Sequence, residues 1–251
     1  MDLQKTENQI VTWIKKQVDD AGCKGIVVGL SGGIDSVVVA ALSKKAFPKS
    51  TLGIIMPCMS HAEDRKHAEL LARKFHIPTQ VIDLEDTFKS IVKVLTGKEY
   101  DKEKHQGMVF ANLKPRLRMT TLYYFAGKHS YLVAGTDNKS EAMIGYFTKY
   151  GDGGVDILPI TSLYKRDVRK LAKHLGVPKG IITKKPSAGL WEGQTDEGEM
   201  GITYDELDEI LFRIDTGKDL SGFEKEKVEK VKRMIRLSEH KRHLPPGCKL
   251  E

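Results

Sequence analysis

Short hydrophobic runs alternate with helical patterns through the first two thirds of the sequence, and this alternation restricts the fold more than any other feature. Runs rich in β-branched and aliphatic residues predict four buried parallel strands, at residues 25–30, 51–56, 79–84 and 130–134. Patterns typical of helices occupy residues 36–46, 62–75, 86–95, 112–127 and 164–175. The spacing predicts an open, mainly parallel, doubly wound α/β sheet with helices on both faces and right-handed crossovers.

For two of these helices the sequence also predicts which residues face the core or cap the helix. Leu70, Leu71 and Phe75 fall on one stripe of the 62–75 pattern, which is expected to face inward. Asn112 is a plausible N-cap for the helix at 112–127, and Pro115 is acceptable if it lies in the first turn.

Beyond residue 135 the sequence changes character. Residues 135–160 are rich in glycine and polar side chains, which favours a functional segment. Residues 184–201 have little periodicity and are predicted to form a mobile loop. Thr203 and Glu206 form a capping-box pattern that predicts a helix at 203–214, and a terminal helix is expected at 221–239. We expect one domain over residues 1–251, with a core at about 8–180 and a loop and C-terminal helical extension at about 181–251.

Composition excludes several other classes of protein. Hydrophobic residues make up 40% of the 251, enough for one substantial core, and no run approaches the roughly 18 apolar residues of a transmembrane helix. The three cysteines form no CxxC pair, so neither a disulfide framework nor a cysteine-rich zinc site is expected, and a cytoplasmic location fits. The net charge of +7 favours anionic ligands, although charges that alternate in sign more often mark a solvated helix face.

A glycine- and serine-rich loop joins the first predicted strand to the first predicted helix. Its residues are Gly29, Leu30, Ser31, Gly32, Gly33, Ile34, Asp35 and Ser36. Without a Cβ, Gly32 and Gly33 allow backbone N–H groups to face an anion, and Ser31 and Ser36 add hydroxyl donors at a helix N-terminus. The loop predicts a phosphate site, since a cluster that merely caps a helix is rare directly after a buried strand.

The loop departs from other nucleotide-binding motifs. It lacks the lysine of GxxxxGK[ST] and the spacing of GxGxxG. It contains Asp35 instead, and a carboxylate beside phosphates is expected to act through a divalent cation.

A second motif follows the fourth predicted strand, in the run Gly135-Thr136-Asp137-Asn138-Lys139-Ser140-Glu141. The carboxyl ends of parallel strands meet at one edge of the sheet, so Glu141 is expected near Asp35 as a second ligand of Mg²⁺. Each charge taken alone could equally be a solvated loop residue.

These motifs resemble those of a known family. The first loop resembles the pyrophosphate loop of the N-type ATP pyrophosphatases, which cleave ATP between its α- and β-phosphates. The run GTDNKSEAMIGYFTKYGDGGVDILPI is similar to the signature of the ammonia-dependent NAD synthetases, and the similarity covers residues from about 8 to 243.

The resemblance implies a set of substrates and site residues. ATP is implied at residues 29–36 with Thr136, Lys165 and Ser187, and Mg²⁺ at Asp35 and Glu141. Deamido-NAD is implied at Arg116, Lys149, Asp156, His240 and Lys241. Pro115 and Ser187 depart from what the family often has at these positions; Ser187 keeps the hydroxyl of the more usual threonine. Ordinary salt bridges or solvated side chains remain the alternative reading of each cation, and a helix C-terminus explains His240 nearly as well.

The implied reaction has two steps. The nicotinate carboxylate attacks the α-phosphorus of ATP and expels pyrophosphate, and ammonia then attacks the acyl-adenylate to give NAD and AMP. Glu141, Asp35, Lys149 and Asp156 are the implied catalytic residues, and either Asp152 or Asp156 is expected to take a proton from ammonium. Residues 184–201 and 86–107 are the segments expected to exclude water. Free ammonia is the expected nitrogen source, because 251 residues leave no room for an amidotransferase domain.

Other readings remain. The ATPase part of a GMP synthetase or a tRNA-thiolating enzyme would use the same loop, although thiolating enzymes usually have paired cysteines. A nucleic-acid-binding protein would explain the positive charge, but no such module is recognisable, and neither nucleic acid nor membrane is expected as a partner. The resemblance also implies a homodimer. Five apolar residues could contribute to its interface or simply to the core: Phe110, Leu113, Leu117, Leu122 and Phe125.

Overall fold

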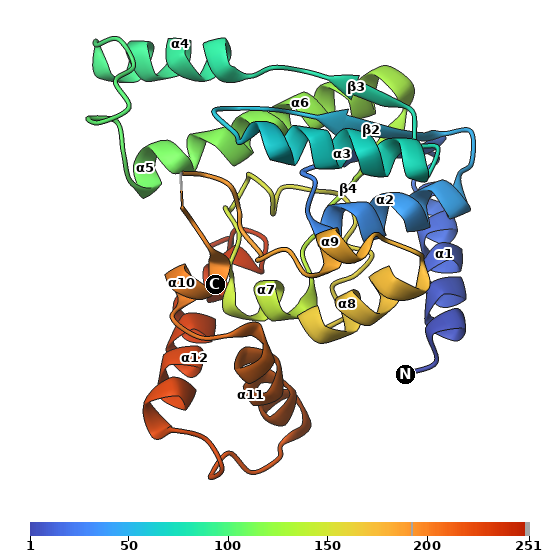
Figure 1. Ribbon diagram of the computed structural model, residues 1–251, viewed down its shortest axis with the longest axis vertical. Helices are drawn as coiled ribbons and strands as arrows, with labels where there is room; N and C mark the ends of the chain where they lie inside the picture. The colour runs from blue at the N-terminus through green and yellow to red at the C-terminus, as the bar shows by residue number, and fades with distance from the viewer. Residues whose placement is uncertain (192, 249–251) are drawn as a thin grey trace.

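The computed structural model describes residues 1–191 and 193–248, and within them it contains a four-stranded parallel sheet. The strands lie in the order β3-β2-β1-β4 (Figure 1). Their bounds are β1 Gly25–Gly29, β2 Thr51–Ile55, β3 Thr79–Val81 and β4 Tyr131–Ala134. Val27 in the central strand pairs with Leu52 on one side and Val133 on the other. The predicted open parallel α/β sheet is confirmed.

One face of the sheet is covered by helices from both halves of the chain. They are α1 Leu3–Asp20, α2 Ile34–Ala46, α3 Ala62–Lys74, α8 Lys165–His174 and α9 Lys179–Ile182. Ile26 and Val28 of β1 point to this side and lie in one apolar cluster with residues of these helices. Alternate strand residues face opposite sides, so the intervening Val27 faces the other layer.

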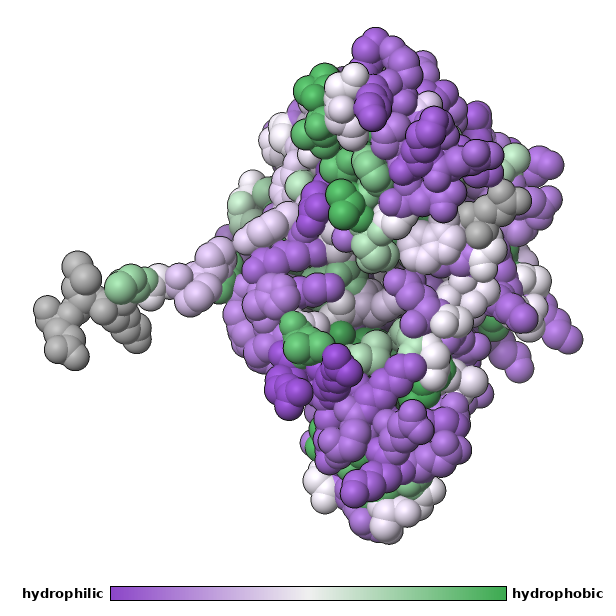
Figure 2. Space-filling model, turned by 90° about the vertical axis from the view of Figure 1, so that its left-hand side faces the viewer, coloured by the Kyte–Doolittle hydropathy of each residue, from purple (hydrophilic) through white to green (hydrophobic). Residues whose placement is uncertain are grey.

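The second face carries α4 Glu85–Thr96, α5 Met108–Ala111 and α6 Leu113–His129. Phe88 of α4 and Leu122 and Phe125 of α6 pack there against Val27 and Val133. Figure 2 shows hydrophobic atoms reaching the surface near the top of its view, where α4 ends. Val94 is 83% exposed there and Val109 of α5 is 77% exposed, so this layer also presents apolar side chains outward.

The C-terminal residues form a separate apolar cluster below the sheet in Figure 1. Its helices are α7 Lys139–Ile144, α10 Asp196–Met200, α11 Tyr204–Thr216 and α12 Lys225–Leu237, followed by the short 3-10 helix Glu239–Lys241. The predicted capping box of α11 is present, because Thr203 accepts from the Glu206 N–H and the Glu206 carboxylate from the Thr203 N–H. Within the described residues, no helix is long and apolar enough to cross a bilayer.

Several local predictions are wrong. β3 is exposed along its length rather than buried, because it lies at the edge of the sheet and none of its residues belongs to an apolar cluster of the described structure. Leu70 is 46% exposed, whereas Leu71 is buried. The Asn112 side chain caps nothing; its oxygen accepts from the Thr148 hydroxyl instead. Pro115 is the third residue of α6, within its first turn, as expected.

Five helices were not predicted from the sequence: α1, α5, α7, α9 and α10. Helix α1 is marked by Asp2, whose side chain accepts from the Lys5 N–H, and by Ile10, Ile14 and Val18, which recur every four residues on its buried side. The segment 184–201, predicted as a mobile loop, contains α10, whose N-terminus is capped by the Thr195 hydroxyl.

Candidate active site

The loop between β1 and α2 is held by hydrogen bonds among its own residues. Ser36 Oγ donates to the Gly33 carbonyl at 3.0 Å and lies 3.1 Å from Ser31 Oγ, while the Gly33 N–H donates to Ser31 Oγ at 3.2 Å. The side chains of Leu30 and Ile34 are buried in the core. The Leu30 N–H donates to the Ile54 carbonyl at 2.9 Å, so of these two residues Ile34 is the one that can offer its backbone N–H to a ligand, as the predicted phosphate loop requires.

Gly32 is the most constrained residue of the loop. Its φ is +81°, and a Cβ at this position would lie 2.4 Å from the Asp64 carbonyl oxygen of α3. L-residues avoid this backbone region, and the neighbouring atom belongs to the backbone and cannot easily move. Glycine is required here by both conformation and space.

We expect Gly32→Ala to lower the free energy of unfolding by about 1–3 kcal/mol, because it combines an unfavourable backbone angle with a steric clash. Urea denaturation measures the loss. Gly33→Ala is the matched control: Gly33 has a φ of −86°, and a Cβ would meet only the Ser31 hydroxyl, at 3.3 Å. Equal stability of the two variants would contradict this explanation.

The structure brings Asp35, Glu141 and Lys165 together from α2, α7 and α8. Lys165 Nζ lies 2.6 Å from Asp35 Oδ2 and 2.9 Å from Glu141 Oε1. The lysine side chain is only 2% exposed, whereas the two carboxylates keep 17% and 12%. An ammonium group therefore joins the two carboxylates on their buried side and leaves part of each open.

Burial and charge oppose each other in this cluster. Burial alone lowers the pKa of Lys165, but Asp35 and Glu141 outweigh it, so the pKa of Lys165 is raised and the ammonium stays protonated. Burial raises the pKa of Glu141 to about 7, although the Lys165 ammonium favours the ionised form.

Asn138 orders both carboxylates. It is the N-cap of α7 in a capping box: its side chain accepts from the Glu141 N–H, and the Glu141 carboxylate accepts from the Asn138 N–H. The same side chain donates through Nδ2 to Asp35 Oδ1 at 3.0 Å. The run Asn138-x-x-Glu141 thus forms a helix start and positions the two predicted metal ligands.

The N-terminus of α8, which carries Lys165, is fixed by residues of other helices. Tyr164 makes no side-chain cap there. Instead the Lys165 N–H donates to Ser140 Oγ at 3.0 Å and the Arg166 N–H to Asp208 Oδ2 at 2.8 Å, while Ser140 donates to Asp208. The start of α8 is thereby held against α7 and α11.

These carboxylates fit a magnesium ion. Among the described residues, no three His, Cys, Asp or Glu side chains gather into a metal-binding group. Mg²⁺ needs fewer protein ligands, because it is usually held by one or two carboxylates together with substrate phosphates and water. Asp35 and Glu141, each partly exposed and beside the predicted phosphate loop, suit that arrangement.

Two further predicted ATP residues lie outside the cluster. Thr136 is half-buried just beyond β4, and Ser187 is exposed, with its hydroxyl accepting from the Gly189 N–H. The segment that carries Ser187 is tied to α3 by the Lys184–Asp64 ion pair at 2.6 Å. Because Asp64 also contacts Gly32, this ion pair places residue 184 near the loop.

Four of the five residues predicted to bind deamido-NAD form a connected group. Arg116 donates to the Lys149 carbonyl at 3.4 Å, Lys149 Nζ to the His240 carbonyl at 2.6 Å, and Lys241 Nζ to the Gly145 and Phe147 carbonyls at 2.9 Å. These bonds join α6, the loop after α7 and the 3-10 helix. Positive side chains that are far apart in the sequence thus gather at one place.

The fifth residue, Asp156, is held elsewhere. Its carboxylate accepts from the Tyr123 hydroxyl at 2.9 Å and from the Val133 N–H at 2.8 Å. Asp152 accepts from the Thr148 N–H through one oxygen. Both aspartates are exposed, and both oxygens of Asp156 have donors.

Several polar residues of the site were not predicted from the sequence. The Tyr204 hydroxyl lies between Glu141 and Asp196, and Asn138 contacts Asp35. Asp137 is 6% exposed, and burial together with the nearby carboxylates raises its pKa well above the usual value. Of these residues, only Asn138 has a sequence signal that could have indicated its role, the capping-box pattern that it forms with Glu141.

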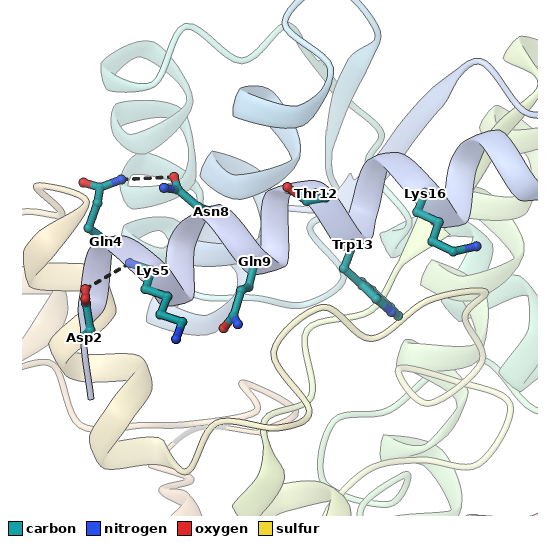
Figure 3. Close-up of a pocket in the computed structure, with 8 residues that line it drawn as sticks. All are labelled: Asp2, Gln4, Lys5, Asn8, Gln9, Thr12, Trp13 and Lys16. Carbon is teal, nitrogen blue, oxygen red and sulfur yellow. Dashed lines mark hydrogen bonds between the residues drawn. The ribbon is translucent and has the colours of Figure 1, made fainter.

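A shallow hollow elsewhere takes no part in this site. Figure 3 shows its lining, which comes from α1 and the residue before it: Asp2, Gln4, Lys5, Asn8, Gln9, Thr12, Trp13 and Lys16. The predicted site residues are absent from this lining, and the hollow is the outer surface of one helix.

The sheet and its loop define the class of protein: an α/β enzyme that binds a nucleotide at the carboxyl edge of a parallel sheet. Comparison with known proteins gives the family. A family model described as NAD synthase matches residues 6–245, and the chain belongs to that family.

Named relatives agree over the full length. An "NH(3)-dependent NAD(+) synthetase" of Carboxydothermus hydrogenoformans is 50% identical over 242 residues, covering 96% of each chain. Among solved structures, an NMN synthetase from Francisella tularensis superimposes with a TM-score of 0.90 at 35% identity, covering 100% of both chains. An NH3-dependent NAD synthetase from Campylobacter jejuni superimposes with a TM-score of 0.83 at 28% identity, covering 99% of this chain and 100% of the other.

Proposed function

We propose that this protein catalyses the ATP-dependent amidation of deamido-NAD by ammonia, giving NAD, AMP and pyrophosphate through an acyl-adenylate. The observation that carries the proposal is the Asp35–Lys165–Glu141 cluster beside the loop after β1, in a chain of the NAD synthase family. Relatives named as ammonia-dependent NAD synthetases, about half identical over nearly the whole chain, support the choice of substrates.

The first step needs charge stabilisation on the departing pyrophosphate. We assign this to the free N–H groups and the hydroxyls of residues 29–36, with Thr136 and Ser187 as further ATP contacts and Lys165 as a buried cation behind the two carboxylates. When bound at Asp35 and Glu141, Mg²⁺ would neutralise phosphate charge. Lys165 is a rigid buried cation at the same place, so its positive charge needs no rearrangement during the reaction.

Deamido-NAD carries a diphosphate and a carboxylate, which suit the group formed by Arg116, Lys149, His240 and Lys241. Asp156 is the remaining proposed contact. For the removal of a proton from ammonium we choose Asp152, because both oxygens of Asp156 already accept hydrogen bonds, from the Tyr123 hydroxyl and the Val133 N–H. We place the reaction in the cytoplasm.

The assay that tests the function supplies ATP, Mg²⁺ and an ammonium salt with one of three acids: deamido-NAD, nicotinate mononucleotide or xanthosine monophosphate. The mononucleotide is included because its amide is the product named for the similar Francisella tularensis structure. We expect the highest kcat/KM with deamido-NAD, equal amounts of NAD, AMP and pyrophosphate, and no replacement of ammonium by glutamine. Preference for another acid would overturn the proposal.

Lys149→Ala is expected to raise KM for deamido-NAD, or to lower kcat, by about tenfold, because one charge-assisted hydrogen bond to the dinucleotide is lost. Steady-state kinetics with each substrate varied separately measure the change, and KM for ATP should stay the same. Lys170→Ala, which removes a solvated lysine paired with Asp167 on α8, is the matched control. Unchanged kinetics in Lys149→Ala would remove it from the site.

We also propose a homodimer that uses the apolar surface of α4, α5 and α6. Leu122 and Phe125 are core residues, and Phe110, Leu113 and Leu117 are partly buried against them, so they do not form this surface. It is formed instead by exposed side chains: Val94, Leu95, Met108, Val109 and Tyr124. Large apolar side chains exposed on these three consecutive helices favour an interaction surface.

Light scattering during size exclusion is expected to give twice the mass of one chain. Val109→Lys should shift the equilibrium to monomer by placing a charge in the interface, whereas Leu70→Lys, at an exposed leucine of α3, should not. A wild-type protein that elutes as a monomer at micromolar concentration would contradict the proposal.

A further inference from the structure

The hydroxyl of Tyr204 lies between two carboxylates from different elements. Tyr204 is fully buried, and its Oη lies 2.9 Å from Glu141 Oε1 and 3.1 Å from Asp196 Oδ2. A phenolic hydroxyl carries one proton. The two carboxylates therefore share a single donor.

Glu141 has few other fixed contacts. Lys165 donates to the same oxygen, Oε1, whereas Oε2 accepts, among the residues that the structure describes, only from the Asn138 N–H, at 3.4 Å. Lys165 also donates to Asp35, so its ammonium is shared between the two carboxylates. The direction of the Glu141 carboxylate thus depends strongly on the donor at Tyr204.

Tyr204 itself is held firmly. It is the first residue of α11, and its N–H donates to Glu197 Oε1 of α10 at 2.9 Å. Asp196, at the start of α10, is 5% exposed and also accepts from the Tyr146 hydroxyl at 3.3 Å. The junction of α10 and α11 therefore presents the hydroxyl to Glu141 from a fixed position.

We propose that Tyr204, assisted by Asp196, is a positioning residue for Glu141 and keeps its carboxylate aligned with Asp35 for Mg²⁺ bound with ATP. The inference rests on the proposed function, because it takes Glu141 as a metal ligand. Without the hydroxyl, Glu141 and Asp196 lose their shared donor and repel each other, so Glu141 turns away from its partner ligand.

The test is calorimetric binding of α,β-methylene-ATP, which cannot be cleaved at the α–β bond, with and without Mg²⁺. In the wild type, Mg²⁺ should tighten binding. In Tyr204→Phe we expect this tightening to shrink by about tenfold, the value of one hydrogen bond to a charged group, while binding without Mg²⁺ stays the same. A generally loosened fold would weaken binding under both conditions.

Tyr164→Phe is the matched control. Tyr164 is a buried tyrosine of the same apolar cluster, but its hydroxyl contacts Asp215 at 3.3 Å instead of Glu141. It should bind the analogue like the wild type. Equal Mg²⁺ effects in Tyr204→Phe and the wild type would overturn the inference alone. The lack of any Mg²⁺ effect in the wild type would overturn the metal assignment and the inference with it.

Asp196→Asn gives a second, independent measurement. If Asp196 acts on Glu141 through the Tyr204 hydroxyl, Asp196→Asn alone should change how strongly Mg²⁺ tightens binding of the analogue. Added to Tyr204→Phe, the same substitution should cause no further change. Additive effects in the double variant would show that Asp196 acts by another route and would remove it from the inference.

Discussion

Replacement of Asp35 by alanine is expected to slow ATP–pyrophosphate exchange by at least about 1,000-fold, with the fold preserved. Asp35 is the one carboxylate inside the loop after β1, and it contacts both Lys165 and Asn138. Its loss removes a proposed metal ligand and frees the lysine from half of its counter-charge. Exchange of radioactive pyrophosphate into ATP in the presence of deamido-NAD measures this step apart from the attack of ammonia.

Asp167→Ala is the control for this experiment. Asp167 lies in the first turn of α8, close to Lys165 in sequence, but it pairs with the solvated Lys170. It should keep most of the exchange activity. If Asp35→Ala retained near-normal exchange while its circular dichroism matched that of the wild type, the metal role of Asp35 would be wrong.

Lys165→Met should be the most damaging single change to stability, with a loss of about 3–5 kcal/mol in the free energy of unfolding near pH 8. The methionine fills a similar volume but leaves Asp35 and Glu141 facing each other without their shared cation. Urea denaturation measures the loss, and Lys170→Met is the control on the solvated side of α8. Stability equal to that of the control would contradict the role given to the buried ammonium.

The loss in Lys165→Met should also depend on pH in a definite direction. Burial raises the pKa of Glu141 to about 7 in the folded protein, and removal of the lysine raises it further. A carboxyl whose folded pKa is raised stabilises the fold below its unfolded pKa, and this contribution disappears as the pH rises through the folded value. The variant should therefore be closer to the wild type at pH 5 than at pH 8, and the opposite trend would refute the explanation.

The parts of the site that could be predicted from sequence are those encoded locally. The loop after β1 is a continuous run in which glycine, serine and a helix start follow a buried strand, so its shape depends on near neighbours. Glu141 was placed near Asp35 by one topological rule, that parallel strands end at the same edge of the sheet.

The parts that were missed depend on contacts between distant residues. Asn138 meets Asp35 across 103 positions, and Tyr204 meets Glu141 across 63. Nothing in the local pattern of a helix start at Thr203 shows where the next side chain will point. The exposure of β3 was missed for a related reason, because a strand of alternating or apolar residues does not reveal its place at the edge of a sheet.

The buried ammonium of Lys165 also bears on how the protein matures. Carboxylates buried together repel each other, and a site that depends on a bound metal for its counter-charge is stabilised only when the metal binds. Here the lysine serves as a permanent internal counterion that three separate helices share. The newly made chain can thus complete its fold before any nucleotide binds.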